Sequence, residues 1–302
     1  MTQQHKARRL FGDGKGNAAL TGPGRLLARY ILSMVAWRLA SAAMVLLVWT
    51  GLSLLSGGRL PSPLDALRQL AHFIRPGLPA PGLTPDLSLL THAGASALRA
   101  YGGLVISLFL FLPLGILLGA KRLSYYSTIG VIEFLRSVPA FMLILVLLSL
   151  HVTGEWGRMA CVVFAVGVLL TDYAASAMRN MPVDRIEILR AMRANPWQIF
   201  WKAMWVPLLL NAVLPTLRIG VGVAVIIALV VETLVQPQTG LGVLINAKLG
   251  QVNVEGGMAL ILVAGFLGWV GNFLVSVVSD VLWWVFAGRP LTPARPPAIR
   301  QP

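Results

Sequence analysis

The chain has 302 residues, of which 57% are hydrophobic and only 12% are charged, whereas a soluble domain carries about 25% charged residues. This scarcity of charge and a mean hydropathy of +0.76 exclude an ordinary soluble fold and indicate an integral membrane protein. The net charge of +14 would suit a nucleic-acid-binding protein, but the hydropathy does not. The single cysteine, Cys161, excludes an intramolecular disulfide framework and a cysteine-cluster metal site.

Six apolar runs are long enough to cross a bilayer, which takes about 20 residues in a helix. None alternates as the strands of a membrane barrel do, so the runs predict an all-α integral membrane protein with six transmembrane helices. No small-residue cleavage site follows the first run, which we expect to be a retained helix and not a signal peptide. The expected spans are 31–55, 100–120, 130–151, 159–178, 207–232 and 258–287.

The basic residues lie mainly on one side of these spans. Of the 25 Lys and Arg residues, 17 fall in the N-terminal segment, the loops 121–136 and 179–206, and the C-terminal tail, whereas six fall in the opposite loops. Basic loops stay in the cytoplasm, so we expect both termini to be cytoplasmic. The ends, 1–30 and 288–302, have the composition of disordered segments. The net charge is then a signal of membrane topology, with no nucleic acid implied.

Segment 56–99 is expected to be extracytoplasmic and amphipathic. Pro63 suits the first position of a helix that Ser62 caps, and Leu64, Leu67 and Leu70 then share one face. Such a helix lies at the membrane interface. An ordinary surface loop remains the alternative.

Segment 179–206 is the most informative part of the sequence. Asp184 and Glu187 are typical of a helix start, where carboxylates face the positive end of the helix dipole. Asn195-Pro196 then breaks the helix, because the residue before proline avoids the helical region. The pattern predicts a helix-turn-helix between two spans. Its mixed polarity favours docking to a protein partner, with a plain interfacial loop as the alternative.

This segment resembles the cytoplasmic coupling loop of ABC importer permeases, whose pattern is Glu-Ala-Ala, three residues, Gly, nine residues, Ile-x-Leu-Pro. Other stretches, which together span about 60–250, resemble in order the nitrate/sulfonate/taurine branch of that family. These stretches are Leu60-Pro61-Ser62-Pro63, Ser96-Ala97-Leu98-Arg99, Pro113-Leu114-Gly115-Ile116-Leu117-Leu118-Gly119, Leu135-Arg136-Ser137-Val138-Pro139 and Thr239-Gly240-Leu241-Gly242.

The coupling loop departs from the family pattern at several positions. Glu187 matches the motif's Glu, but Ile188 and Leu189 replace its alanines. The Gly position falls on Arg193, or on Ala194 if one residue is inserted. These departures bear on the coupling contact and leave the fold assignment in place.

The resemblance implies a type I ABC importer permease fold in a bacterial inner membrane, with a core domain at 100–287. It implies as partners a second permease copy in a homodimer, two ATPase subunits and an extracytoplasmic solute-binding protein, with a small oxyanion such as nitrate, a sulfonate or taurine as solute. The chain has no GxxxxGK[ST] motif for binding ATP, so the ATPase partner is expected to hydrolyse the ATP. The chain itself is expected to be a transport subunit and not an enzyme, and to hold no cofactor. The alternative is an ATP-independent secondary transporter or channel. The residues that the resemblance assigns to ATPase coupling are Glu187, Arg190, Arg193, Ala194, Asn195, Pro196 and Trp197.

Polar residues inside spans each need a reason, since an ionisable group at mid-bilayer costs about 2.5–3.5 kcal/mol. Asp172 and Arg218 have two alternative roles, either a structural ion pair or helix contact, or a part in the translocation path. Glu133 and Arg136 are three residues apart, so they are spaced to pair with each other. The four scattered histidines indicate no metal site. The candidates for the translocation path are Asp172, Tyr173, Arg218 and Glu232, and those for an outer gate, or a flexible turn, are Gly240, Leu241 and Gly242.

Overall fold

A computed structural model describes residues 23–57, 59–74, 88–152, 154–181 and 183–287. Within these ranges every regular element is a helix, which confirms the predicted all-α class. The chain divides into two compact units, 1–65 and 66–302. The tail 288–302 and most of the N-terminal range expected to be disordered lie outside the described residues, although helix α2 already begins at Pro23.

The first unit consists of α2 (Pro23–Leu55) and the turn that leads into α3 (Pro63–Ile74). Two side chains of α2 hold this turn: Ser53 Oγ donates to the Leu60 carbonyl at 2.7 Å, and Trp49 Nε1 donates to the Pro61 carbonyl at 3.0 Å. Ser62 and Asp65 then cap α3 reciprocally, each accepting from the other's backbone N–H, at 3.2 and 3.3 Å. The predicted helix start at Ser62-Pro63 is therefore confirmed.

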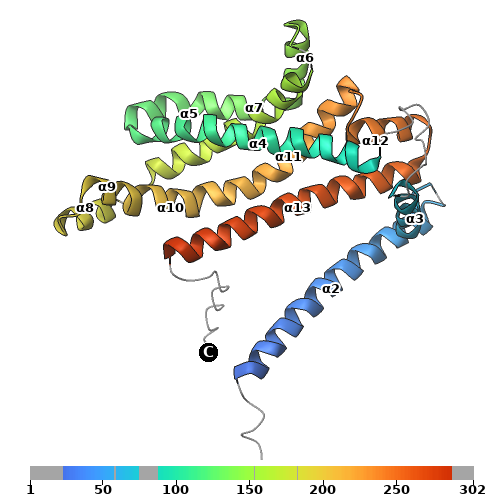
Figure 1. Ribbon diagram of the computed structural model, residues 1–302, viewed down its shortest axis with the longest axis horizontal. Coiled ribbons are helices and arrows are strands. Elements are labelled where there is room, and N and C mark those ends of the chain that lie inside the picture. The colour runs from blue at the N-terminus through green and yellow to red at the C-terminus, as the bar shows by residue number, and fades with distance from the viewer. Residues whose placement is uncertain (1–22, 58, 75–87, 153, 182, 288–302) are drawn as a thin grey trace, which may run out of the picture. The chain divides into compact units, whose positions relative to one another are not determined.

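The second unit is built around α4 (Leu89–Ala120) and α7 (Glu155–Arg179), which lie side by side (Figure 1). Glycines allow this approach: a Cβ on Gly119 would lie 2.3 Å from the Ala175 carbonyl oxygen, and one on Gly115 would lie 2.8 Å from Ala174 Cβ. Small residues let helix backbones pack closely in a membrane protein, where packing rather than hydrophobic exclusion holds helices together. The main core also includes residues of α6 (Leu143–Ser149) and α11 (Leu214–Val235).

Helix α4 begins well before the expected residue 100. Ser88 caps it, with its hydroxyl accepting from Thr91 N at 3.4 Å. The sequence-based boundary was wrong because Arg99 was taken as a loop residue, whereas it lies inside the helix. Its charge is balanced within the protein, as described below.

The expected third span, 130–151, is not one straight helix. Helix α5 (Arg122–Ser137) is followed by the short η2 (Ala140–Met142) and α6, and the pair is bent by 77°. Pro139 explains the break, because it has no N–H to donate and disfavours the helical region for the residue before it. Val138 is accordingly extended, with φ −72° and ψ 127°.

The predicted helix-turn-helix is present as α8 (Val183–Ala191) and α9 (Pro196–Ile199). The second helix does not stop before the fifth span as expected, since Pro196–Val235 forms one 40-residue helical run. Two π-helical stretches interrupt it, η3 (Phe200–Trp205) and η4 (Leu209–Val213), with α10 (Val206–Leu208) between them. Each π stretch ends two residues before a proline, Pro207 or Pro215, which cannot donate to the α-helical ladder.

The sequence did not predict α12 (Leu241–Gly250), a short apolar helix that precedes α13 (Val254–Ala287). Its Leu241 and Leu244 are buried in a cluster with Leu260 of α13. Five of the described helices are long and apolar enough to cross a membrane, or six if the bent pair forms one span. Helices α8 and α9 lie at one end of the second unit and α12 at the other (Figure 1).

Candidate functional site

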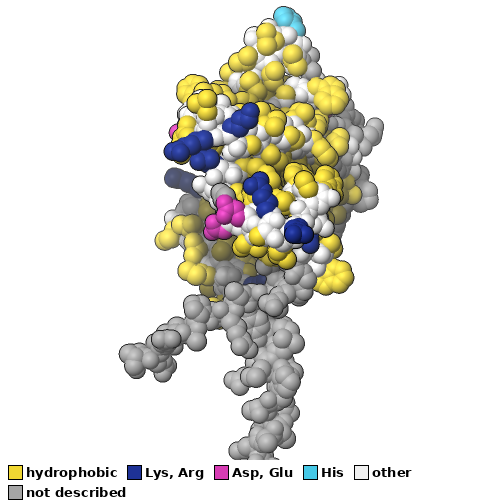
Figure 2. Space-filling view, turned by 90° about the vertical axis from the view of Figure 1, so that its left-hand side faces the viewer, with side chains coloured by type: hydrophobic (Ala, Val, Ile, Leu, Met, Phe, Trp, Pro, Cys, Tyr) yellow, Lys and Arg dark blue, Asp and Glu magenta, His cyan; other side chains and the backbone are white. Residues whose placement is uncertain are grey.

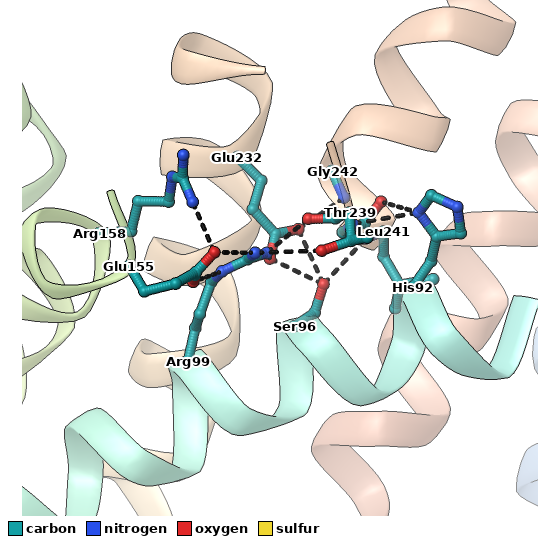
Figure 3. Close-up of polar contacts among 10 residues, drawn as sticks. His92, Ser96, Arg99, Glu155, Arg158, Glu232, Thr239, Leu241 and Gly242 are labelled. Atoms are coloured by element: carbon teal, nitrogen blue, oxygen red, sulfur yellow. Dashed lines mark hydrogen bonds and ion pairs between the residues drawn. The ribbon is translucent and has the colours of Figure 1, made fainter. Parts of the chain in front are cut away.

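A polar stripe on α4 faces the segment that joins α11 to α12. His92, Ser96 and Arg99 are spaced to share one face of the helix, and all three are buried. Each reaches the backbone of Thr239–Gly242 (Figure 3). Ser96 Oγ accepts from Leu241 N at 2.8 Å, and His92 Nδ1 lies 3.1 Å from Gly240 N. An apolar helix thereby binds a non-helical turn through side chains.

Arg99 uses the full donor capacity of its guanidinium. Nε and Nη2 donate to the two carboxylate oxygens of Glu155 at 2.6 and 2.8 Å. Nη1 donates to Glu232 Oε1 at 2.6 Å and to the Thr239 carbonyl at 2.7 Å, and Nη2 also approaches Thr239 Oγ1 at 3.4 Å. A guanidinium has five N–H donors, so Arg99 retains no unmet donor although only 3% of its side chain is exposed.

Glu232 is the buried acceptor of the network, with 0% of its side chain exposed. Besides Arg99, its oxygens accept from Ser96 Oγ at 2.8 Å and from Gly242 N at 2.9 Å. A buried carboxylate is stable only when it is paired and hydrogen-bonded. Here both conditions are met by groups from α4 and from the start of α12.

Two glycines make this contact possible. Gly240 has φ +151°, and a Cβ there would lie 2.5 Å from Glu232 Cδ and 2.9 Å from Arg99 Nη1. A Cβ on Gly242 would lie 2.4 Å from the Leu229 carbonyl oxygen. The Gly-x-Gly spacing therefore lets the backbone approach a charged pair closely, while Leu241 between the glycines is buried in the apolar cluster.

The outer network, as we call Ser96, Arg99, Glu155, Glu232 and Thr239–Gly242, joins α4, α7, α11 and the start of α12. Glu155 at the N-terminus of α7 is its solvent-facing member, with 55% of its side chain exposed, and it also pairs with Arg158 at 2.6 Å. Removing one partner of a buried ion pair costs about 3–5 kcal/mol, because the other charge is left uncompensated. The outer network thus joins these helices through a contact that depends on every charged partner being present.

The structure brings together residues that the sequence had placed in separate roles. Glu232, a path candidate, and the outer-gate candidates Gly240, Leu241 and Gly242 form one contact region. Arg99, which carries the pairing, was not among the candidates. The spacing of His92, Ser96 and Arg99 behind the capping Ser88 was the signal that could have identified it.

Helix α8 ends in a Schellman motif whose left-handed residue is Arg193, with φ +55°. Ala194 N donates to the Leu189 carbonyl at 2.9 Å, and Arg193 N donates to the Arg190 carbonyl at 2.9 Å. The left-handed position of this motif is usually glycine. Arg193 therefore occupies a position at which glycine is usual, whereas Ala194 has no positive φ.

The next helix begins with a complete capping box. Asn195 Oδ1 accepts from Trp197 N at 3.3 Å, Gln198 Oε1 accepts from Asn195 N at 3.2 Å, and Pro196 occupies the first turn. Exposed Trp197 opens a ladder of aromatic contacts along the helix, with neighbouring ring centroids 5.7–6.3 Å apart. The ladder comprises Trp197, Phe200, Trp201 and Trp205.

A comparison with known protein families identifies the family of this chain. Residues 111–282 match the family described as the binding-protein-dependent transport system inner membrane component. The chain belongs to this family. It is an ABC importer permease of the binding-protein-dependent type, which confirms the resemblance found in the sequence.

Individual relatives of this permease are distant. A putative ABC transporter permease of Methanocaldococcus jannaschii is 24% identical over 67% of this chain and 75% of its own length. The nitrate import permease of Synechocystis is 24% identical over 64% of this chain and 70% of its own. An inward-facing structure of the MetNI methionine ABC transporter shares the fold, with a TM-score of 0.50 and 19% identity, over 64% of this chain and 95% of that one.

The remaining path candidates of the permease have three different environments. Asp172 of α7 forms an ion pair with Arg136 of α5, so Arg136 does not pair with Glu133 as its spacing suggested. Tyr173 lines a cavity of about 260 Å³ between α7 and the run that leads into α11, together with polar Asn180 and Asn211. Arg218 is exposed on α11. The structure therefore does not bring these residues together in one site.

A second cavity of the permease lies at the bend after α5. It has a volume of about 380 Å³ and is lined by the Arg136–Phe141 segment and by apolar residues of α7 and α11. Among the described residues, no group of three or more His, Cys, Asp or Glu side chains is placed to hold a metal ion.

Proposed function

We propose that this permease forms the translocation path of an ATP-driven importer and that α8 and α9 bind the ATPase that drives it. The single observation that supports this most directly is the capped α8–α9 segment at one end of the long helices (Figure 1). Its structure is fixed locally, by a Schellman motif and a capping box, and most of its described side chains are exposed. A surface that is rigid without being packed is suited to docking.

The chemistry of this surface fits a protein partner. Ile188, Met192 and Trp197 are exposed apolar side chains, 59%, 73% and 65% accessible, and Glu187, Arg190 and Arg193 surround them. Apolar anchors within a charged rim are typical of protein interfaces. The proposed partner is an ATPase subunit, one for each of two permease copies.

The orientation follows from this assignment. Within the second unit, the end that carries α8 and α9 also carries most of the described basic residues, so we place it in the cytoplasm. The outer network then faces the extracytoplasmic side of a bacterial inner membrane, where a solute-binding protein would deliver the solute. The distribution of basic residues in the sequence supports cytoplasmic positions for both termini. The outer gate is accordingly assigned to Gly240, Leu241 and Gly242, held by Glu232.

A second permease copy would complete the path. Asn211, Pro215, Arg218 and Ile226 are all exposed and lie on one stripe of the long helix that contains α11. An exposed arginine inside a span requires a water-filled cavity or a partner helix. Tyr173 and the polar cavity beside this stripe are its neighbours on α7. Together they support a path between two copies.

The proposed solute is a small oxyanion. Arg218 would supply a cationic group to the path, and the similarity to a nitrate import permease is consistent with this class. Direct uptake of labelled nitrate, sulfonate or taurine with the cognate binding protein distinguishes among these solutes.

The decisive experiment removes charge from the docking surface. In a reconstituted complex with the ATPase encoded beside this chain, Glu187→Ala with Arg193→Ala should leave membrane insertion intact and reduce transport-coupled ATP hydrolysis. Arg59→Ala, which removes an exposed charge from the first unit, is the matched control. Normal coupling in the double variant would refute these sites, and transport that persists without ATP would support a secondary transporter instead.

A further inference from the structure

Two arginines of different helices converge on one tyrosine ring. The guanidinium carbon of Arg122, at the start of α5, lies 5.8 Å from the ring centroid of Tyr126, and that of Arg179, at the end of α7, lies 5.9 Å from the same centroid. Lys121 precedes Arg122 and is exposed. Three cationic residues therefore gather at the junction of these helix ends.

No carboxylate neutralises this cluster within the described part of the chain. The ion pairs found there use Arg99, Arg136 and Arg158, and neither Arg122 nor Arg179 takes part in one. A tyrosine face attracts a cation but carries no net charge. Both arginines therefore contact one tyrosine ring without an acidic partner, which favours an anion at this place.

The position along the helices indicates where such an anion resides. Arg122 follows directly on α4 and Arg179 ends α7, and both of these helices are long and apolar enough to cross the membrane. The ends of spanning helices lie at the depth of the lipid headgroups. Figure 2 views the molecule toward this end, where Lys and Arg side chains outnumber acidic ones beside hydrophobic surface.

The neighbouring apolar side chains favour a lipid over a free phosphate ion. Tyr126, whose ring both guanidinium groups approach, is 60% exposed, and Leu123, the residue after Arg122, is 84% exposed. A phosphate ion gains nothing from such groups, whereas a phospholipid presents its phosphate to the arginines and its acyl chains to the leucine. Basic pockets between helix ends are known to suit anionic headgroups.

From these observations we infer that Arg122, Arg179 and Tyr126 form a binding site for the headgroup of an anionic phospholipid. The lipid bridges the start of α5 and the end of α7, next to the point where the chain enters α8. It would thereby restrain the end of α7 from which α8 emerges.

The test measures lipid retention by the purified full-length chain. Native mass spectrometry with added phosphatidylglycerol should show bound lipid and a raised Tm, whereas phosphatidylcholine and inorganic phosphate should give neither. Each arginine near a membrane surface contributes about 1 kcal/mol, so Arg122→Gln and Arg179→Gln should each weaken binding about fivefold.

Two further variants control for folding and for general charge. The Arg122→Lys/Arg179→Lys double variant retains both charges and should keep most of the binding even if the single glutamine variants are unstable. Arg59→Gln removes an equal charge outside the cluster and should leave retention unchanged. Equal retention of phosphatidylcholine, unchanged binding in the single glutamine variants, or full stabilisation by inorganic phosphate would each overturn the inference.

Discussion

The outer network and the α8–α9 segment are both polar features of an apolar chain, yet they are stabilised in opposite ways. In the outer network, Arg99 and Glu232 are buried and paired across two helices far apart in sequence. In the α8–α9 segment, every described hydrogen bond of the turn is local, and the charged side chains face outward. The polar groups of the outer network bind one another within the chain, whereas the side chains of the α8–α9 segment are available to bind another molecule.

The largest expected effect comes from breaking the outer network. Arg99→Met keeps an unbranched apolar stem but leaves Glu232 buried without its cation, so the free energy of unfolding should fall by about 3–5 kcal/mol. Thermal unfolding in detergent, compared with Arg59→Met as an exposed control, measures this loss. A loss below about 1 kcal/mol, the range of exposed ion pairs, would show that the network is solvated.

A smaller effect is expected from Gly240→Ala, which adds one methyl group inside the same network. The new Cβ would overlap the Glu232 carboxylate at 2.5 Å and would require a backbone conformation that alanine disfavours. Such strain costs about 1–3 kcal/mol. Gly222→Ala, where the space around the new Cβ is open, serves as the matched control on α11. If both variants unfold at the same temperature, the close approach to Glu232 is not maintained in the membrane.

The smallest effect belongs to the α8–α9 turn and has the opposite sign. Arg193→Gly relieves a left-handed residue and should stabilise the turn by about 1 kcal/mol. The amide hydrogen of Ala194 should exchange more slowly in the Arg193→Gly variant than in the Arg193→Ala variant. The global Tm of the two variants should be the same. Both variants remove the same charge, so a difference in ATPase coupling between them separates the turn's conformation from the charge at this position. Faster exchange in the glycine variant would contradict the assigned conformation.

Local features were predictable from the sequence and non-local ones were not. The caps at Ser62-Pro63 and Asn195-Pro196 involve residues within three positions of each other, so the pattern contains all the information needed. The all-α class followed equally directly from the lengths of the apolar runs. Arg99 was misplaced because its two carboxylate partners lie on other helices, and sequence spacing cannot reveal such a pairing.

Other differences arise from backbone geometry. The break at Val138-Pro139 and the π stretches before Pro207 and Pro215 depend on proline, yet a hydropathy pattern continues across them unchanged. Helix α12 is shorter than a membrane span, so a search for long runs missed it. Similarly, the Schellman hydrogen bonds place Arg193 in a left-handed conformation in which glycine is usual, and an arginine in the sequence gives no sign of this.

The helical run from Pro196 to Val235, which includes two π stretches, has a mechanical consequence. At about 1.5 Å per residue, its 40 residues extend about 60 Å, roughly twice the hydrocarbon thickness of a bilayer. A push or twist applied near Trp197 therefore reaches Glu232 through a single hydrogen-bonded rod and not through loops. The two π stretches are the places where such a rod can bend, because π-bulges are among the few sites at which helices kink. The stiffness of these two π stretches would determine how much of a displacement near Trp197 is transmitted to Glu232.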